Sequence, residues 1–378
     1  MKRRDFIGSS AIVAAGMALG TGTYQVVGKA EEKMRATRIK GEYKEPEIVE
    51  PVSLCDPEGH LNPDAVGWSR KPLHKCNLSM GWPRKKKWHY WCITTDSFLF
   101  SFVVADIDYI GLASAYFLDY ETKELIDKAI ITPFGRGCPM PEEVECSVSF
   151  SHRRMPTFII HEPGIIKVHL ECPSMKGKKV EADLIIKKPE GHETLNVVIP
   201  WSRERFQFTS KQNTLPTEGV VKIGDRTYEC KTGKAWATLD FGRGLWPYKT
   251  EWNWGTFSGT QNGDTIGINL GGKWTDGTGT NENGICYKGK LYKVGEDLLW
   301  EYDRNNFMAP WRVRTEYSDM IDLTLTPFYD KTERISLGVL STEGHQCFGY
   351  YSGTLKFDNK TIAVNNLMGW AEEHIARW

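Results

Sequence analysis

The sequence has no excess of charge of either sign. Its 378 residues include 48 lysines and arginines and 48 aspartates and glutamates, so the formal net charge is zero. A chain without net charge has no overall electrostatic attraction to nucleic acid or anionic lipid, and we expect no nucleic-acid partner. The hydrophobic share of 40% and the charged share of 25% are ordinary for a globular protein. Coiled-coil, collagen-like and disordered classes are therefore disfavoured.

The sequence also lacks any Cys-x-x-Cys pair, although it contains nine cysteines. Structural zinc sites of the knuckle or ribbon type use such closely spaced pairs. We therefore predict no metal site, and no motif indicates a cofactor. An odd number of cysteines cannot pair completely within one chain. We interpret them as small buried apolar groups and expect no disulfide framework.

No apolar run is long enough to span a bilayer, which takes ~20 residues. The charge-free stretch at residues 6–19 is shorter than that, so we expect no integral membrane span. It follows the basic start Arg3-Arg4-Asp5-Phe6-Ile7 and precedes the small-residue site Gly28-Lys29-Ala30. This arrangement resembles a twin-arginine export signal. It implies that residues 1–30 are a cleaved leader and that twin-arginine export machinery delivers the protein to the periplasm. An uncleaved, cytoplasmic N-terminus is the alternative.

Aromatic residues are abundant, with 14 Trp, 15 Tyr and 16 Phe beside 36 Gly. Aromatic side chains favour strands, and glycines favour tight turns and bulges. Apolar and polar residues also alternate in many segments. For example, Ile166, Val168 and Leu170 are separated by Lys167 and His169. Turn signals follow at short intervals, which predicts an all-β fold of antiparallel meanders closed into barrels or sandwiches.

The predicted strands are numerous enough for two barrels of about eight strands each. We place the boundary near residue 200, because Lys188-Pro189-Glu190-Gly191 and Ile199-Pro200 interrupt the strand series. The predicted parts are a leader (1–30), a charged linker (31–53), a turn-rich segment (54–87), a first barrel (88–200) and a second barrel (201–378). Residues 369–378 are predicted to form a short C-terminal helix. The basic run at residues 84–87 is interpreted as a solvated turn, with a phosphate or membrane patch as the alternative.

Several motifs resemble those of a known family. They include Leu54-Cys55-Asp56-Pro57-Glu58-Gly59, Trp82-Pro83-Arg84-Lys85-Lys86-Lys87-Trp88, Phe206-Gln207-Phe208-Thr209-Ser210-Lys211-Gln212-Asn213, Leu239-Asp240-Phe241-Gly242-Arg243-Gly244 and Gly369-Trp370-Ala371-Glu372-Glu373-His374. Together they resemble the bacterial and fungal domain-of-unknown-function family 2804 over about residues 54–378. That family carries no established reaction, so the resemblance implies no catalytic residue.

A second resemblance concerns the fold. Trp252-Asn253-Trp254-Gly255, followed by Asn262-Gly263-Asp264, is similar to the Trp-x-Trp strand and turn of carotenoid hydratase and tocopherol cyclase proteins. Those proteins consist of two lipocalin-like barrels in tandem. The resemblance implies an all-β fold of two tandem antiparallel lipocalin-like (calycin-type) β-barrels.

The stretch from Trp236 to Glu282 is the strongest candidate for a site, because it combines tryptophans with acidic side chains. On a strand, Trp252 and Trp254 share one face with hydroxyl residues, which suits an amphipathic cavity; plain core packing is the alternative. A turn after Asp240 is expected to form a buried pair with Arg243, either catalytic or structural. The candidate ligand-binding residues are Trp252, Trp254, Tyr248, Arg243, Asp276 and Lys211.

Three functions fit this pattern. The first is a lyase, hydratase or cyclase acting on an apolar, isoprenoid or lipid-like molecule. A desolvated carboxylic acid, with Asp240 the first choice and Glu282 the second, would protonate a carbon–carbon double bond. Aromatic faces would stabilise the resulting cation. The second is a non-catalytic lipid carrier, and the third is a carbohydrate-active protein, since Trp platforms and paired carboxylates also suit sugars. The first two require a hollow apolar chamber among the tryptophans, and the sequence does not decide between enzyme and carrier.

Overall fold

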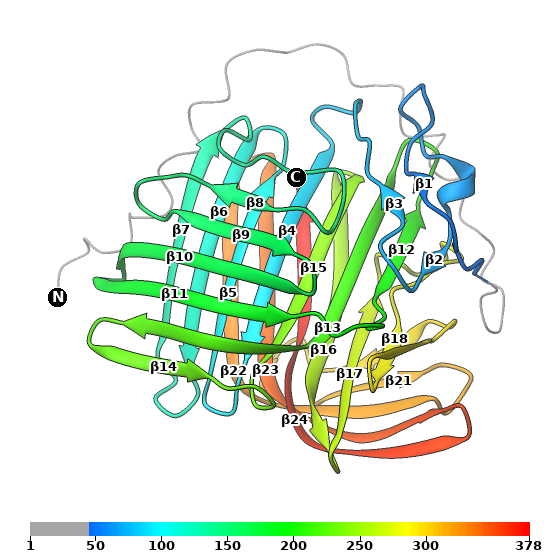
Figure 1. Ribbon diagram of the computed structural model, residues 1–378. Helices are drawn as coiled ribbons and strands as arrows, with labels where there is room; N and C mark the ends of the chain where they lie inside the picture. The colour runs from blue at the N-terminus through cyan, green and yellow to red at the C-terminus, as the bar shows by residue number, and fades with distance from the viewer. Residues whose placement is uncertain (1–44) are drawn as a thin grey trace.

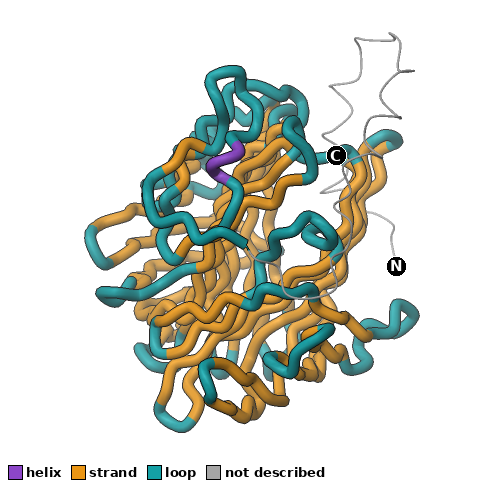
Figure 2. Tube along the Cα trace, turned by 90° about the vertical axis from the view of Figure 1, so that its right-hand side faces the viewer, coloured by secondary structure: helices purple, strands orange, loops and turns teal. Residues whose placement is uncertain are grey.

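The computed structural model describes residues 45–378, so the predicted leader and most of the predicted linker lie outside the described residues. Strands make up most of this part of the chain, as Figure 2 shows, and its single helical element is the 3-10 turn η3 (Pro63–Ala65). Two large antiparallel sheets dominate, and the short β1 (Val52–Ser53) and β3 (His74–Lys75) pair separately. The predicted all-β fold of two tandem antiparallel units is confirmed.

The first sheet has thirteen strands in the main order β7-β6-β5-β4-β15-β13-β11-β10-β9-β8. They are β2 (Trp68–Ser69), β4 (Lys85–Thr94), β5 (Phe98–Asp106), β6 (Ile110–Asp119), β7 (Leu125–Pro133), β8 (Val148–Phe150), β9 (Thr157–Glu162), β10 (Ile165–Met175), β11 (Lys178–Lys187), β12 (Leu195–Pro200), β13 (Phe206–Ile223), β14 (Arg226–Cys230) and β15 (Trp236–Leu245). The 18-residue β13 pairs with β15 at one end and with β11 at the other. The sheet therefore curls into a half-barrel, with β8–β11 crossing in front of β4–β7 (Figure 1).

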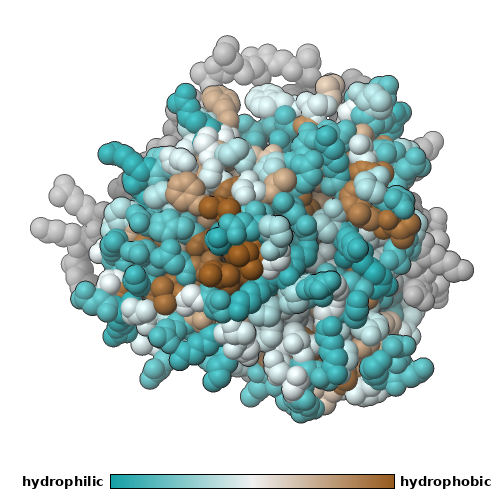
Figure 3. All heavy atoms as spheres, viewed as in Figure 1, coloured by the Kyte–Doolittle hydropathy of each residue, from teal (hydrophilic) through white to brown (hydrophobic). Residues whose placement is uncertain are grey.

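The interior of this half-barrel is filled by alternate residues of its strands. Phe98, Phe100 and Phe102 of β5 point inward and are almost completely buried. Such side chains contribute about 1.5–3 kcal/mol each by leaving water. The outer surface of β9–β11 is largely hydrophilic around a small apolar area (Figure 3). Ile160 of β9 is 44% exposed.

The second sheet has nine strands in the order β19-β18-β17-β16-β24-β23-β22-β21-β20. They are β16 (Lys249–Gln261), β17 (Asp264–Gly272), β18 (Gly284–Tyr287), β19 (Lys290–Lys293), β20 (Leu298–Glu301), β21 (Trp311–Thr315), β22 (Ile321–Leu337), β23 (Leu340–Phe357) and β24 (Lys360–Arg377). It curls around its own core, in which Trp311, Leu323 and Tyr351 are fully buried. Each sheet therefore has one face on its own core, and the opposite faces of β4–β6 and β16, β23 and β24 pack against each other.

The boundary predicted at residue 200 is wrong. Residues 206–223 and 236–245 form β13 and β15, which lie in the middle of the first sheet. The chain crosses to the second sheet only between Leu245 and Lys249. Pro189 and Pro200 mark the ends of strands within one unit, and proline at a strand end carries no information about which sheet the next strand joins.

The predicted C-terminal helix is also wrong, because residues 360–377 form β24 between β16 and β23. Trp370 and Glu372 face the first sheet, whereas Ala371 faces the second core. The Ala and Glu residues favour a helix when the segment is taken alone, and pairing with a strand on each side overrides that preference.

Two further expectations for the N-terminal part need correction. The linker is not a free tether from residue 45 onward, because Glu45 is buried in an ion pair with Lys293 and Ile48 bonds to the carbonyl of Trp68. Lys85–Lys87 begin β4, and Lys86 is fully buried. The basic run is therefore not a solvated turn.

Each sheet has a glycine where one of its long strands bends. Gly219 of β13 has φ +127° and Gly353 of β23 has φ +142°. A Cβ atom would lie 2.1 Å from the Asp183 carbonyl oxygen at the first position and 2.2 Å from the Asp322 carbonyl oxygen at the second. Both positions therefore need glycine, because the backbone conformation and the close approach of the neighbouring strand exclude a side chain.

We expect Gly219→Ala and Gly353→Ala to lower the free energy of unfolding. The left-handed conformation costs about 1–2 kcal/mol for a non-glycine residue, and relief of the clash costs a further ~1–3 kcal/mol. Gly224→Ala is the control, because Gly224 has φ +58° and no atom lies within 4 Å of the point that a Cβ would occupy. Chemical denaturation of the three variants gives the comparison. Equal losses in all three would contradict a role for strand contact.

Candidate functional site

A row of polar side chains crosses the outer face of the first sheet. Lys211 of β13 pairs in register with Asp240 of β15, which pairs with Tyr90 of β4. The alternation of each strand places these residues opposite its core residues, such as Phe208 and Phe241. They therefore face the second sheet.

A matching row crosses the facing surface of the second sheet. Trp254 of β16 pairs in register with Glu372 of β24, which pairs with Gln346 of β23. The two rows touch, because the Lys211 Nζ lies 4.3 Å from the centre of the Trp254 ring. The Tyr90 ring meets the same indole edge-on at 5.9 Å. We call the two rows together with Glu282 the inter-sheet cluster: Tyr90, Lys211, Asp240, Trp254, Glu282, Gln346 and Glu372.

Lys211 lies between two carboxylates. Its Nζ is 3.0 Å from the Asp240 Oδ1 and 3.3 Å from the Glu282 Oε2, and its side chain is only 6% exposed. Burial alone would lower the pKa of Lys211, but the two carboxylates outweigh burial and raise it. Thr209 adds a hydrogen bond to the Asp240 carboxylate at 3.3 Å. The cluster thus contains a lysine that stays charged in the interior.

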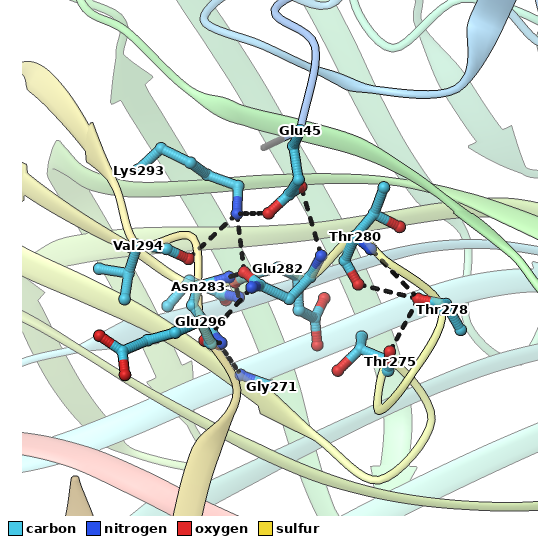
Figure 4. A network of polar contacts seen from close by, with 12 residues as sticks. Glu45, Gly271, Thr275, Thr278, Thr280, Glu282, Asn283, Lys293, Val294 and Glu296 are labelled. Atoms are coloured by element: carbon cyan, nitrogen blue, oxygen red, sulfur yellow. Dashed lines mark hydrogen bonds and ion pairs between the residues drawn. The ribbon is translucent and has the colours of Figure 1, made fainter. Parts of the chain in front are cut away.

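Glu282 is almost completely buried and accepts a hydrogen bond of 3.0 Å from the Trp274 indole. Burial raises its pKa to about 7, although Lys211 opposes the shift. The residues on either side hold the backbone in place (Figure 4). Gly271 donates to the Asn283 side chain, which donates to the Glu296 carbonyl, and Lys293 binds the Asn281 side chain. This anchoring fixes the direction of the Glu282 carboxyl toward Lys211.

Glu372 is the carboxyl group that sequence analysis missed. It accepts a hydrogen bond of 2.8 Å from the Trp252 indole. No lysine, arginine or histidine of the described chain forms an ion pair with it, and burial raises its pKa to about 7. The side chain nevertheless keeps some accessible surface. Trp370, Glu372 and His374 alternate along the sequence. Read as a strand, this pattern places Glu372 on the same face as Trp370, which is the face that also carries Trp254.

A chain of hydroxyl groups extends the cluster across the interface. The Tyr90 Oη lies 2.9 Å from the Tyr116 Oη, which donates to the Gln346 Oε1 at 2.9 Å. Burial raises the pKa of both tyrosines well above the ordinary value. Both therefore remain neutral donors, and sequence analysis gave no indication of either.

The structure brings together four of the predicted site residues: Asp240, Glu282, Lys211 and Trp254. Trp252 lies beside them, because its indole binds Glu372 and its ring stacks on His374 at 4.2 Å. Within the described residues, no group of three or more His, Cys, Asp and Glu side chains is arranged to hold a metal ion.

The predicted pair of Asp240 and Arg243 is wrong. Both residues lie on the continuous strand β15, so an offset of three places them on opposite faces. Arg243 points into the first core and donates to the carbonyl oxygens of Trp88 and Gly242, each at 2.8 Å. It has no place in the cluster.

Tyr248 and Asp276 also lie elsewhere. Tyr248 is 37% exposed and donates to the Val339 carbonyl oxygen. The Asp276 side chain accepts a hydrogen bond from the Lys273 backbone within a turn. Neither contacts a member of the inter-sheet cluster through a described hydrogen bond or ion pair.

The hollow apolar chamber expected among the tryptophans is contradicted by their packing. The Trp246 ring contacts five other indoles at centre-to-centre distances of 4.9–6.1 Å; they are Trp88, Trp201, Trp252, Trp274 and Trp378. A pocket of about 610 Å³ borders Trp68, Arg70 and Lys293, and a pocket of about 390 Å³ borders Phe98 and Tyr228. Neither pocket is lined by the inter-sheet cluster.

The cluster itself is not sealed. The Asp240 side chain is 14% exposed, and Tyr90, Trp252 and Glu372 are half-buried although all four face the opposite sheet. Water therefore reaches the Asp240 side chain, and Glu372 keeps part of its residue surface accessible. The accessible acids lie beside the packed indoles and not among them.

Neighbouring Glu372 and Glu373 are expected to give opposite pH dependences of stability. The pKa of Glu372 is raised, so its charged form destabilises the fold. This loss in free energy of unfolding is absent below about pH 4.5, grows with pH and is complete above about pH 7. Burial alone would raise the pKa of Glu373, but hydrogen bonds from Lys273, Tyr302 and Arg304 lower it overall. Its stabilising contribution is present above about pH 4.5 and disappears as the pH falls.

Glu372→Gln should therefore raise the free energy of unfolding at pH 8, by up to about 3 kcal/mol, and change little near pH 4. Glu373→Gln should lower it at pH 8, with a difference that shrinks in acid. Urea unfolding across this range measures both. Parallel profiles for the two variants would contradict the assigned environments.

Three solved structures resemble this chain at low sequence identity. CghA with Sch210972 shares 10% identity over 78% of this chain and 89% of its own, with a TM-score of 0.48. A putative AttH from Nitrosomonas europaea shares 11% over 79% and 97%, with a TM-score of 0.44. Kievitone hydratase from Nectria haematococca shares 9% over 80% and 94%, with a TM-score of 0.41.

No curated protein matches the sequence. A family profile, by contrast, covers nearly all of the described chain, since it matches residues 45–378. The chain belongs to the family described as domain of unknown function, DUF2804.

Proposed function

We propose that the inter-sheet cluster is the active site of a hydratase or cyclase that acts on a largely apolar, isoprenoid- or lipid-like molecule. The observation that carries this proposal is Glu372. Burial raises its pKa to about 7, it has no described basic partner, and part of its surface is accessible. A carboxylic acid with these properties is protonated close to neutral pH and is able to donate its proton to a carbon–carbon double bond.

The aromatic residues around Glu372 suit the charge that this step creates. Protonation of a double bond leaves a carbocation on the substrate. The faces of Trp254 and Tyr90 would stabilise it, each by about 0.5–2 kcal/mol. Trp254 already lies against a cation, the Lys211 ammonium. The ion pairs of this ammonium with Asp240 and Glu282 offset its repulsion of a nearby carbocation.

Asp240 fits the second half of the reaction better than the first. It forms an ion pair with Lys211 at 3.0 Å and its side chain is accessible to water. A carboxylate in this position serves as the base that takes a proton from the attacking water or substrate hydroxyl. The new carbon–oxygen bond then forms at the carbocation, and the proton passes back to Glu372 to restore the acid. Glu282 holds Lys211 from the other side and has a positioning role.

The packed indoles limit where an apolar ligand binds. Trp246 and its neighbours pack against one another, so the enclosed chamber that the sequence analysis required is absent from the described residues. The proposal therefore places the ligand on the accessible side of Trp252, Tyr90 and Asp240 instead. A non-catalytic carrier would use the same surface without turnover, and a carbohydrate-active protein would bind polysaccharide. Both are outcomes of the experiment below.

The test uses geranylgeraniol and lycopene as probes, in deuterium oxide, with mass spectrometry of the extracted products. We expect deuterium at carbon, together with hydration or ring closure. Glu372→Gln should reduce this reaction by about 10²-fold or more, because Gln keeps the Trp252 hydrogen bond and loses the proton. Glu373→Gln, on the opposite face of β24, should retain it.

If the parent and all variants bind the probe and release it unchanged, the protein is a carrier and not an enzyme. Retention on polysaccharide resin without either probe binding would favour the carbohydrate-active alternative. Each result would overturn the proposed reaction.

We further propose that the protein is exported to the periplasm by the twin-arginine route. The support is the sequence at residues 1–30, with its paired arginines and short apolar stretch. Changing Arg3 and Arg4 to Lys keeps the charge and should leave the precursor in the cytoplasm, as measured by cell fractionation and immunoblotting. An unchanged exported fraction would refute this route.

A further inference from the structure

We infer that one rim of the molecule docks on an anionic lipid surface. This rim is formed where strands of both sheets end. β4 begins there beside the end of β15. The turn between β5 and β6 and the end of β7 lie at the same level. In the second sheet, β16 begins there beside the end of β24, and the turn between β22 and β23 follows. We call it the terminal rim; it lies toward the point marked C in Figure 1.

Large apolar side chains project from three separate loops of the terminal rim. Trp82 precedes β4 and is 65% exposed. Phe134 follows β7 and is 73% exposed, and Val339 lies in the turn between β22 and β23 and is 62% exposed. Side chains this exposed contribute nothing to either core. Their position at loop tips matches the way peripheral proteins insert apolar groups among lipid headgroups.

Described contacts join the three loops into one surface. The Phe134 backbone bonds to the Tyr109 carbonyl oxygen, and the Lys86 Nζ lies 4.4 Å from the Tyr109 ring centre. Lys86 also lies 5.3 Å from the Trp378 ring centre.

The contacts continue from Trp378 into the second sheet. Arg84, two residues after Trp82, binds the Trp378 carbonyl oxygen and lies over the Tyr248 ring. Tyr248 donates to the Val339 carbonyl oxygen. The exposed tips therefore lie around a continuous band of aromatic and basic side chains.

The rim is richer in basic than in acidic residues, although the chain as a whole is neutral. Arg136, Lys249 and Arg377 are exposed at strand ends or loops of the rim, and Arg334 is 79% exposed. Two of the acidic residues near these elements form ion pairs within the rim. Asp108 pairs with Lys85 at 3.4 Å, and Glu343 lies 3.7 Å from Arg334.

An anionic bilayer is the partner that uses both features. Basic side chains near a bilayer gain from its negative surface potential, and aromatic side chains favour the headgroup region. Basic side chains from separate strands and an exposed Trp and Phe on separate loop tips give a discontinuous surface, which suits many headgroups better than a single peptide. Because the chain as a whole has no net charge, it has no long-range attraction to an anionic bilayer. Any electrostatic attraction must therefore come from the basic residues of the rim.

The test is co-sedimentation of the full chain with phosphatidylglycerol vesicles and with phosphatidylcholine vesicles. We expect binding to the anionic vesicles that weakens at high salt, and little binding to the zwitterionic ones. The triple variant Trp82→Ser, Phe134→Ser, Val339→Ser should lower the bound fraction about tenfold. All variants keep residues 1–44 unchanged, so any contribution from that part of the chain is the same in each.

Controls come from the opposite ends of the strands. Tyr317 is 47% exposed beyond β21, and Tyr317→Ser should leave vesicle binding unchanged. Arg136→Gln with Lys249→Gln should weaken binding and its salt dependence, whereas Lys356→Gln with Lys360→Gln should not. Circular dichroism melting checks that each variant is folded.

Two results would overturn the inference. One is equal sedimentation of the parent and the triple variant with anionic vesicles. The other is that the parent protein does not bind the anionic vesicles. If the parent instead forms a concentration-dependent dimer that the triple variant abolishes, the rim is an interface with a second copy of the chain. Hydratase or cyclase activity on soluble probe is measured in parallel, so loss of docking and loss of catalysis are separable.

Discussion

The charge balance around Lys211 is the constraint on which the interface between the two sheets depends. An ammonium group in the interior is tolerated only when carboxylates and hydrogen bonds compensate its lost hydration. Asp240 comes from the neighbouring strand of the same sheet, and Glu282 comes from a segment anchored to the second sheet. A register slip in β13 or β15 would therefore expose a core residue and also leave a buried charge unpaired. The same arrangement keeps the centre of the interface polar although apolar clusters flank it.

The two apolar clusters on either side of the polar centre have different compositions. Phe348, Trp370 and Tyr116 belong to one, and Trp246 and Trp274 belong to the other. Their packing explains why the abundance of tryptophan indicated where the two sheets meet but wrongly suggested a hollow chamber there. Indoles bury large areas and stack at offset or edge-on angles. Here they join the two sheets, and the carboxyl groups of Asp240 and Glu372 lie at the edge of the stack.

Sequence patterns predicted the strands well because alternation depends on local burial, which each strand carries in its own residues. The pairing order could not be obtained in that way. Pro200 marked a strand end correctly, yet nothing local shows that β13 and β15 return to the first sheet. The same limit hid Glu372, since the Ala and Glu residues of the segment suggested a helix. The sequence allowed Lys211, Asp240 and Trp254 to be grouped because each lies on the polar or aromatic face of a strand, whereas Arg243 was misplaced by assuming a turn within β15.

The position of β24 has a consequence for biosynthesis. Among the described residues, β24 follows β16 and β23 in the chain, yet it is the middle strand of the second sheet and lies between them. While a ribosome is still translating the preceding residues, β16 and β23 have no partner on that side, and unpaired strand edges promote association with other chains. The first unit has no such dependence, because all of its strands are complete at Leu245. Nascent chains should therefore carry a finished N-terminal unit and an aggregation-prone remainder until β24 has emerged, a state in which chaperones have a defined target.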